Sequence, residues 1–397
     1  MSENNSKIPF NKPFTNDVIE HKTFEIMTRN PLGDLDQDRR LEAQLRMSIG
    51  LSDRTDVFFT QSATQALEMM ALTLDLKVGD EIIIPSYTYA ATANAFARTG
   101  ATLVFADVSM ETLNITIDTI EPLITEKTKA IIPIHYGGFA ADLHGLLNLS
   151  DTYCITLLED AAHGIGSQYE KKPLGTMGQM GCLSFHQSKN ITAGGSGGVL
   201  FINNETIERD KVEAIYYQGT DRVDFLKGKT SAYNWQRLGG EYAMTPYAMA
   251  YLEASLCDLE MVTRRRTMLW ARYQEAFNVR LFHFLKGQTK HPIGLPTKIA
   301  NANGNGHIYY LIMPDAISRE GLRLYLKDRK IDAYTHYEPL HLSEGGKKYG
   351  KTMTELTHTE AIANRMIRLP IFDALSEAEQ DRVIDAVVAY VKHYGKR

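Results

Sequence analysis

Short apolar runs alternate with helix-like segments between about residues 56 and 205, and this alternation limits the possible folds more than any other feature. A strand-like run at 57–59 precedes a helix that we predict over 62–76. Five further runs are predicted to be buried strands, at 81–85, 101–105, 130–135, 155–160 and 198–202. Near-continuous apolar strands separated by helices are typical of a parallel sheet covered on both faces. The sequence therefore predicts a mostly parallel α/β sheet flanked by helices.

The length of the chain predicts a second, smaller unit. It has 397 residues, whereas single hydrophobic cores stop growing beyond roughly 250–300 residues. We expect a large domain at 1–250, which includes the N-terminal segment, and a long linking helix with a small C-terminal domain at 251–397. We predict one or two long helices at 246–280, and after them a strand at 307–313, a helix at 318–330 and a strand at 332–337. Ser376 and Glu379 fit a capping box that opens the last helix, and Gly395 fits its end.

The composition excludes several classes of protein. The net charge of -5 and the pI of about 6.2 argue against a nucleic-acid binder, and we predict that Arg264-Arg265-Arg266 forms a solvated helix face. Three scattered cysteines are too few for a disulfide framework. No apolar run approaches the roughly 20 residues of a membrane helix, and the polar start of the chain lacks a signal core. We therefore expect a cytoplasmic protein that binds neither membrane nor nucleic acid.

Two ionisable residues stand at the ends of predicted strands. Asp160 ends the run at 155–160, and ligands of open α/β sheets lie beyond the carboxyl ends of the strands. A carboxylate there needs a cation, such as a protonated pyridine nitrogen, although a helix cap or a loop salt bridge is commoner for a lone Asp. Lys189 follows an apolar run and precedes the glycine-rich stretch 194–198. A lysine in a crowded site can lose its proton and act as a nucleophile, whereas an isolated one is usually exposed.

Two further segments lie at neighbouring strand ends. The stretch 60–67 opens a helix with small hydroxyl residues, and the free N–H groups of a helix N-terminus form a ready phosphate site. Plain N-capping is the alternative. Tyr89 lies in the stretch 85–92, where an aromatic ring can lie flat on a planar cofactor; core packing is the alternative. The order of the four segments, and their common position at strand ends, make the combination specific.

Taken together, these residues resemble the DegT/StrS family of sugar-nucleotide aminotransferases, which are fold type I transferases dependent on pyridoxal 5'-phosphate (PLP). The resemblance runs from Ile8-Pro9-Phe10 to the C-terminal helix. The matching stretches are 79–88, 159–162, 181–186, 189–190, 233–235 and 337–341. The resemblance implies a mostly parallel central sheet flanked by helices, a smaller C-terminal α/β domain, and a homodimer with shared active sites.

The resemblance also implies a role for each matching residue. Lys189 would bond to the aldehyde of PLP, and Asp160 would keep its pyridine nitrogen protonated. Tyr89 would stack on the ring, with His163 beside the cofactor. The residues implied for the phosphate are Ser62, Ala63, Thr64 and Ser184.

Substrate contacts are predicted mainly on the loop that begins near residue 219. Arg222 and Lys227 would face the substrate diphosphate, with a solvated loop as the alternative. Trp235 and His336 complete the predicted substrate residues. The sequence departs from many relatives at Glu241, where they carry an Asn that reaches the partner subunit's cofactor phosphate. An ionised Glu would repel that phosphate, so this contact between subunits is in question.

The implied reaction is amination of dTDP-4-dehydro-6-deoxyglucose to dTDP-4-amino-4,6-dideoxygalactose, with glutamate as the amino donor. Amination of dTDP-3-dehydro-6-deoxyhexose at C3 is an alternative that the physics of the sequence does not separate. A PLP-dependent sugar dehydratase is less favoured, because that branch replaces the lysine with histidine. A non-catalytic protein of the same fold would not need the pair of Lys189 and Asp160.

Overall fold

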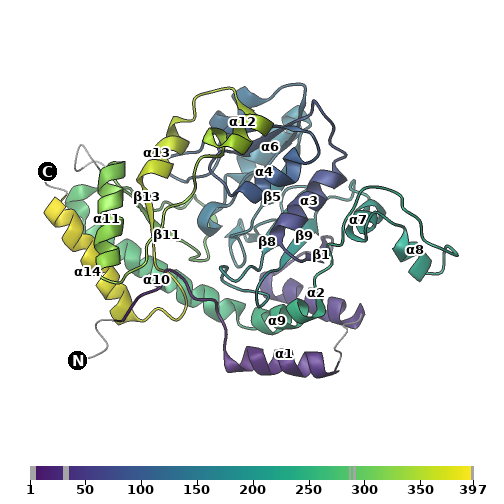
Figure 1. Ribbon diagram of the computed structural model, residues 1–397, viewed down its shortest axis with the longest axis horizontal. Helices are drawn as coiled ribbons and strands as arrows, with labels where there is room; N and C mark the ends of the chain where they lie inside the picture. The colour runs from purple at the N-terminus through teal and green to yellow at the C-terminus, as the bar shows by residue number, and fades with distance from the viewer. Residues whose placement is uncertain (1–5, 30–34, 286–287, 289–291, 395–397) are drawn as a thin grey trace.

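One large sheet organises the molecule, for which a computed structural model describes residues 6–29, 35–285, 288 and 292–394 (Figure 1). In spatial order its strands are β1 (Asp56–Thr60), β9 (Gly198–Ile202), β8 (Met180–Ser184), β5 (Thr156–Asp160), β4 (Thr128–Ile131), β2 (Glu81–Pro85), β3 (Thr102–Ala106) and β12 (Gly350–Thr352). All neighbouring pairs are parallel except those made by β9 with β1 and with β8. The predicted mostly parallel sheet flanked by helices is confirmed.

The strand β9 runs antiparallel to β8, which the series of apolar runs did not predict. A parallel return needs a crossover connection, usually a helix, whereas antiparallel strands need only a loop. Residues 185–197 join β8 to β9 without a helix. This loop therefore stays at the carboxyl end of β8, and it carries Lys189.

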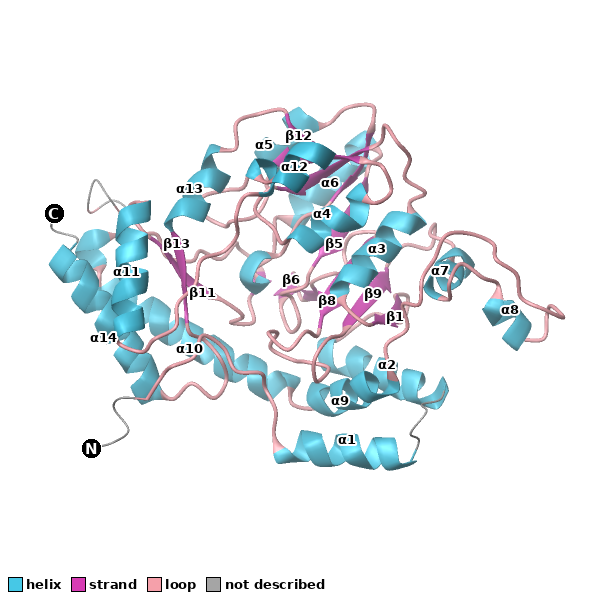
Figure 2. Cartoon of the chain, viewed as in Figure 1, coloured by secondary structure: helices cyan, strands magenta, loops and turns pink. Residues whose placement is uncertain are grey.

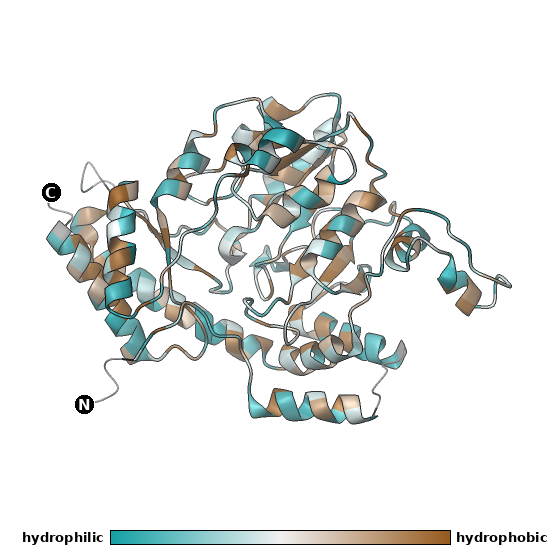
Figure 3. Cartoon of the chain, in the orientation of Figure 1, coloured by the Kyte–Doolittle hydropathy of each residue, from teal (hydrophilic) through white to brown (hydrophobic). Residues whose placement is uncertain are grey.

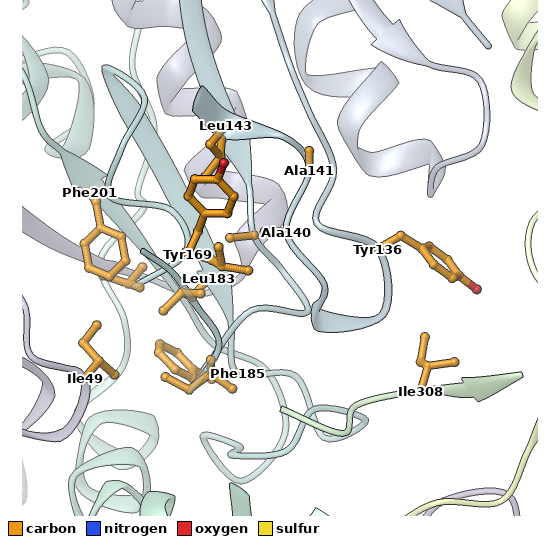
Figure 4. Close-up of a cluster of buried hydrophobic side chains, with 14 of the residues drawn as sticks. Ile49, Tyr136, Ala140, Ala141, Leu143, Tyr169, Leu183, Phe185, Phe201 and Ile308 are labelled. Atoms are coloured by element: carbon orange, nitrogen blue, oxygen red, sulfur yellow. The ribbon is translucent and has the colours of Figure 1, made fainter. Parts of the chain in front are cut away.

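Two apolar layers cover the two faces of the sheet (Figure 2). Side chains alternate along a strand, so Ile82 and Ile84 pack on one face and Ile83 on the other. The first face is covered by α3 (Ala63–Thr73), α4 (Ala90–Ala97) and α7 (Arg209–Tyr216). The second is covered by α1 (Asp17–Arg29), α2 (Leu35–Ile49), α6 (Leu143–Tyr153) and α9 (Pro246–Leu256). Figure 4 shows part of this second layer, around Leu183, Phe185 and Phe201.

The C-terminal part has a core of its own. It packs α10 (Leu259–Arg280), α11 (Ala316–Asp328) and α14 (Glu377–Tyr394) around the two-stranded sheet of β11 (Tyr309–Ile312) and β13 (Met366–Leu369). Hydrophilic and hydrophobic residues alternate around α11 and α14, as amphipathic helices require (Figure 3). Ile8 joins this core and β12 joins the large sheet, so the predicted division at residue 250 stays a prediction.

Short elements complete the chain. They are α5 (Ile117–Ile120), β6 (Gln168–Tyr169), β7 (Lys172–Pro173), α8 (Arg222–Leu226), β10 (Ala302–Asn303), α12 (Glu344–Tyr349) and α13 (Thr357–Arg365), with 3-10 turns at Glu121–Leu123, Tyr136–Gly138, Phe282–Phe284 and Leu340–Leu342. Among the described residues, no helix has the length and the apolar character needed to cross a membrane.

Two predictions about the C-terminal part are wrong. No strand forms at 332–337, where Tyr334 makes a single isolated bridge to Arg368; Ile331, just before this segment, makes another to Ile8. Arg266 is buried, at 3% exposure, and donates to the carbonyl oxygens of Gly306, His307 and Ile371. The helical period turns this residue inward while Arg264 remains exposed.

The capping box of the last helix is present. The Ser376 backbone N–H donates to a carboxylate oxygen of Glu379, whose own N–H donates to Ser376 Oγ. The predicted end of the helix, Gly395, lies outside the described residues.

Candidate active site

A cavity of about 510 Å³ opens at the carboxyl ends of β5 and β8, where large-sheet residues meet residues of the C-terminal part. Nine of the twelve predicted site residues line it: Ser62, Ala63, Thr64, Tyr89, Asp160, His163, Ser184, Lys189 and His336. This position agrees with the rule that open α/β sheets bind ligands beyond the carboxyl ends of their strands.

Lys189 brings an amine to the lining of the cavity. Its backbone N–H donates to the His186 carbonyl at 2.8 Å, which fixes the turn after β8. The side chain is half-buried. Burial, together with the charge of Arg368, lowers the pKa of the Lys189 amine from 10.5 to about 8, although the charges of Asp160 and Cys182 oppose the shift. A substantial part of this amine is therefore neutral near physiological pH, as nucleophilic attack requires.

Asp160 provides a buried carboxylate, at 5% exposure, at the end of β5. The Thr92 hydroxyl donates to Oδ2 at 2.7 Å, and the Ala162 backbone N–H donates to Oδ1 at 3.1 Å. Within the described chain, Asp160 has no salt-bridge partner. A buried carboxylate favours a cation beside it, and a protonated ring nitrogen is a cation of suitable size.

The N-terminus of α3 forms a second polar wall. Ser62 is its N-cap and accepts a hydrogen bond from the Gln65 backbone N–H. The first N–H groups of a helix have no partners inside it and attract anions. Gly198 allows β9 to approach this terminus, because a Cβ there would lie 2.4 Å from the Ala63 nitrogen.

Four histidines line the cavity, and three of them, His163, His307 and His336, lie close together. The ring centroid of His163 lies 4.6 Å from that of His307 and 6.3 Å from that of His336. His163 Nδ1 accepts from the Gly137 backbone N–H at 3.2 Å, so its own proton resides on Nε2. Burial, reinforced by the charge of Lys189, lowers the pKa of His163 well below 6.5. Within the described residues, no group of three His, Cys, Asp or Glu side chains could hold a metal ion.

Several cavity residues escaped prediction. Thr92 falls inside the stretch 85–92, one helical turn after Thr88, and that spacing could have indicated it. Phe10, His307 and Arg368 come from the N-terminal segment and the C-terminal part. No local pattern places these three beside Lys189, because only the tertiary fold brings them there.

Three predicted substrate residues do not line this cavity. Arg222, Lys227 and Trp235 belong to an arm, residues 217–241, which contains α8 and projects from the large sheet (Figure 1). Trp235 is 74% exposed, and Lys227 Nζ lies 3.9 Å from a carboxylate oxygen of Glu213. Glu241, which ends the arm, accepts a hydrogen bond from Gln218. The substrate roles of these three residues stay predictions.

The comparison with known proteins decides the class of enzyme. The sequence profile of the DegT/DnrJ/EryC1/StrS aminotransferase family matches residues 25–388. The chain belongs to this family. It is 33% identical over 339 residues to an uncharacterized protein of Methanocaldococcus jannaschii, covering 83% of this chain and 84% of that protein.

Solved structures of other proteins superpose on nearly the whole chain. The aminotransferase TlmJ from Streptoalloteichus hindustanus is 26% identical with a TM-score of 0.86, over 98% of this chain and 100% of TlmJ. DesV of S. venezuelae is 25% identical with a TM-score of 0.82, over 97% of this chain and 99% of DesV. This DegT-family chain is therefore an aminotransferase.

Aminotransferases of the DegT family depend on PLP, and the cavity fits that cofactor. It presents an amine for the aldehyde, a buried carboxylate for the ring nitrogen, and a helix N-terminus for the phosphate. When bound, PLP supplies an aldehyde that condenses with amines and a ring that accepts electrons. Lys189, Asp160 and the first turn of α3 would hold these three parts.

Proposed function

We propose that this aminotransferase transfers the amino group of glutamate to C4 of dTDP-4-dehydro-6-deoxyglucose, giving dTDP-4-amino-4,6-dideoxygalactose. Glutamate exchanges its α-hydrogen and amino group for an oxygen from water and becomes 2-oxoglutarate, while the sugar ketone gains the hydrogen and amino group and releases its oxygen as water. The exchange balances without an external oxidant. The observation that carries the proposal is that Lys189 and Asp160 line one cavity at adjacent strand ends.

The chain's own groups have distinct tasks in this proposal. Lys189 Nζ takes the proton from the α-carbon of the donor and later returns a proton to the sugar carbon; a pKa of about 8 suits an amine to both steps. Asp160 holds the proton on the ring nitrogen, and Thr92 orients the carboxylate. His163 carries its proton on Nε2 and is a neutral hydrogen-bond donor.

A second subunit completes the proposed enzyme. The arm exposes large apolar side chains, namely Phe225, Leu226, Tyr233, Trp235 and Leu238, and Figure 3 shows hydrophobic residues on its helix α8. Clustered exposed apolar residues are typical of surfaces covered by a partner. In a homodimer, the arm of one subunit would reach the cavity of the other, where Arg222 and Lys227 could meet the substrate diphosphate.

The proposed substrate is tested by supplying purified enzyme with PLP, glutamate and either the 4-dehydro or the 3-dehydro sugar nucleotide. Release of 2-oxoglutarate is measured in each reaction, with Lys189→Ala as the inactive control. We expect turnover with the 4-dehydro sugar. Turnover with the 3-dehydro sugar alone would move the amination to C3. Dehydration of the sugar without 2-oxoglutarate release would contradict transamination.

A further inference from the structure

Arg368 places a positive charge in the cavity, and the proposed reaction assigns no role to this residue. It lies on β13, in the C-terminal part, and lines the same cavity as Lys189. A guanidinium has five N–H donors. Within the described chain only Nη2 has an acceptor, the Thr335 carbonyl at 2.9 Å, and the buried Nε has none.

The surroundings of Arg368 hold this guanidinium in place without neutralising it. Cζ of Arg368 lies 4.7 Å from the centroid of the Phe10 ring. The Phe10 ring in turn packs edge-on against Tyr334, with 5.2 Å between the two ring centroids. Among the described residues, no carboxylate pairs with Arg368, and Asp160 is the only carboxylate that lines the cavity. Since Asp160 would pair with the ring nitrogen, the positive charge of Arg368 is left for an anionic group of a bound molecule.

Two anionic groups of the bound molecules have other places. The cofactor phosphate fits the N-terminus of α3, which lies on the other side of β5 from β13 (Figure 1). The substrate diphosphate is assigned to Arg222 and Lys227 of a partner's arm. The two carboxylates of the donor remain, and of these the α-carboxylate is the one held next to the amino group. It must enter this cavity, because the amino group displaces Lys189.

We propose that Arg368 binds the α-carboxylate of the amino donor through its guanidinium fork, with Phe10 packed against the guanidinium to fix its plane. The inference rests on the proposed function in one respect, namely that an α-amino acid is the donor. A planar fork matches a carboxylate with two parallel hydrogen bonds, and an Arg that is already packed loses little side-chain freedom on binding. Its charge also lowers the pKa of Lys189, which keeps part of the nearby amine neutral.

The test measures binding of 2-methylglutamate, which carries the donor's carboxylates but has no α-hydrogen to lose, to the PLP-loaded enzyme by calorimetry. Arg368→Gln removes the charge and Arg368→Lys keeps the charge without the fork. The matched control is Arg365→Gln, three residues earlier and similarly half-buried, whose Nε donates to the Met313 carbonyl outside the cavity. Thermal unfolding of each variant checks that the fold is intact.

We expect Arg368→Gln to weaken binding by about a hundredfold, since the variant loses both the charge and the fork that hold a carboxylate. Arg368→Lys should lie between this variant and the wild type, and Arg365→Gln should bind as the wild type does. Equal binding by wild type and Arg368→Gln would overturn the inference, and so would a wild type that does not bind 2-methylglutamate.

A measurement on the second half of the reaction distinguishes two possible roles of Arg368, namely binding the donor carboxylate and binding the substrate diphosphate. Enzyme loaded with pyridoxamine phosphate is mixed with the keto sugar nucleotide, so that no amino acid takes part. Arg368→Gln should stay within about threefold of wild type in its affinity for the sugar nucleotide. A loss as large as that for 2-methylglutamate would overturn the assignment to the donor. If the keto sugar is not aminated at all, the proposed substrate fails, while the binding measurement with 2-methylglutamate still decides the role of Arg368.

Discussion

The lowered pKa of Lys189 can be measured directly in the enzyme stripped of cofactor. At pH 7.5, an amine with a pKa of about 8 is about one quarter neutral, whereas at the ordinary value of 10.5 only about one thousandth is neutral. Because only the neutral amine is a nucleophile, Lys189 should react roughly two-hundredfold faster at this pH than an unshifted amine of equal access. Its rate should rise with pH to a plateau, with a midpoint near 8.

The assay is brief acetylation of the apoenzyme over a series of pH values, followed by mass spectrometry of the peptide that contains residue 189. The exposed Lys77, modified in the same reaction, serves as the internal reference. Asp160→Asn should move the midpoint to lower pH, because the carboxylate of Asp160 raises the pKa of Lys189. A midpoint near 10.5, or an upward shift in Asp160→Asn, would refute the electrostatic reasoning.

Three further predictions concern the walls of the cavity and the arm. Gly198→Ala should weaken PLP binding by about fivefold to a hundredfold in equilibrium dialysis, since overpacking against the Ala63 backbone costs roughly 1–3 kcal/mol. Gly195→Ala, with open space around its Cβ, should bind PLP normally, and equal affinities of the two variants would contradict the phosphate site at the N-terminus of α3. Thr92→Val should lower kcat by about tenfold to a hundredfold through loss of the hydrogen bond to Asp160, while Thr92→Ser retains most activity; an unchanged Thr92→Val would remove the orienting role. Trp235→Ser should shift the enzyme toward monomer in sedimentation velocity, whereas Ile317→Ser, at a position on α11 that is also exposed, should not. A monomeric wild type would contradict the shared site.

Apolar runs predicted the large sheet well, because strands buried on both faces leave a strong local signal. The runs at 81–85 and 198–202 coincide with β2 and β9. The same logic failed at 332–337, where Ile331 and Ala333 are buried but the backbone forms only single bridges. A strand needs a neighbouring strand in register, which the pattern of one segment does not show.

The candidate site was predictable where its residues follow strands of the large sheet. Asp160 ends β5, and Lys189 follows β8 in the loop that leads to β9. Because β5 and β8 are parallel neighbours in the sheet, the topology brings the two residues together. Arg368 and Phe10 were not predictable, because they reach the cavity from opposite ends of the chain. The signal of Arg368 appears only in three dimensions, as a buried guanidinium N–H without an acceptor.

The central claim is that the amine of Lys189 carries PLP in the cavity that Asp160 closes. Borohydride reduction of the PLP-loaded enzyme, followed by peptide mapping, tests it most directly. A pyridoxyl phosphate group attached to Lys189, and absent from Lys189→Ala, is the predicted result. Attachment to a different lysine, or no covalent attachment in the PLP-loaded enzyme, would contradict the account.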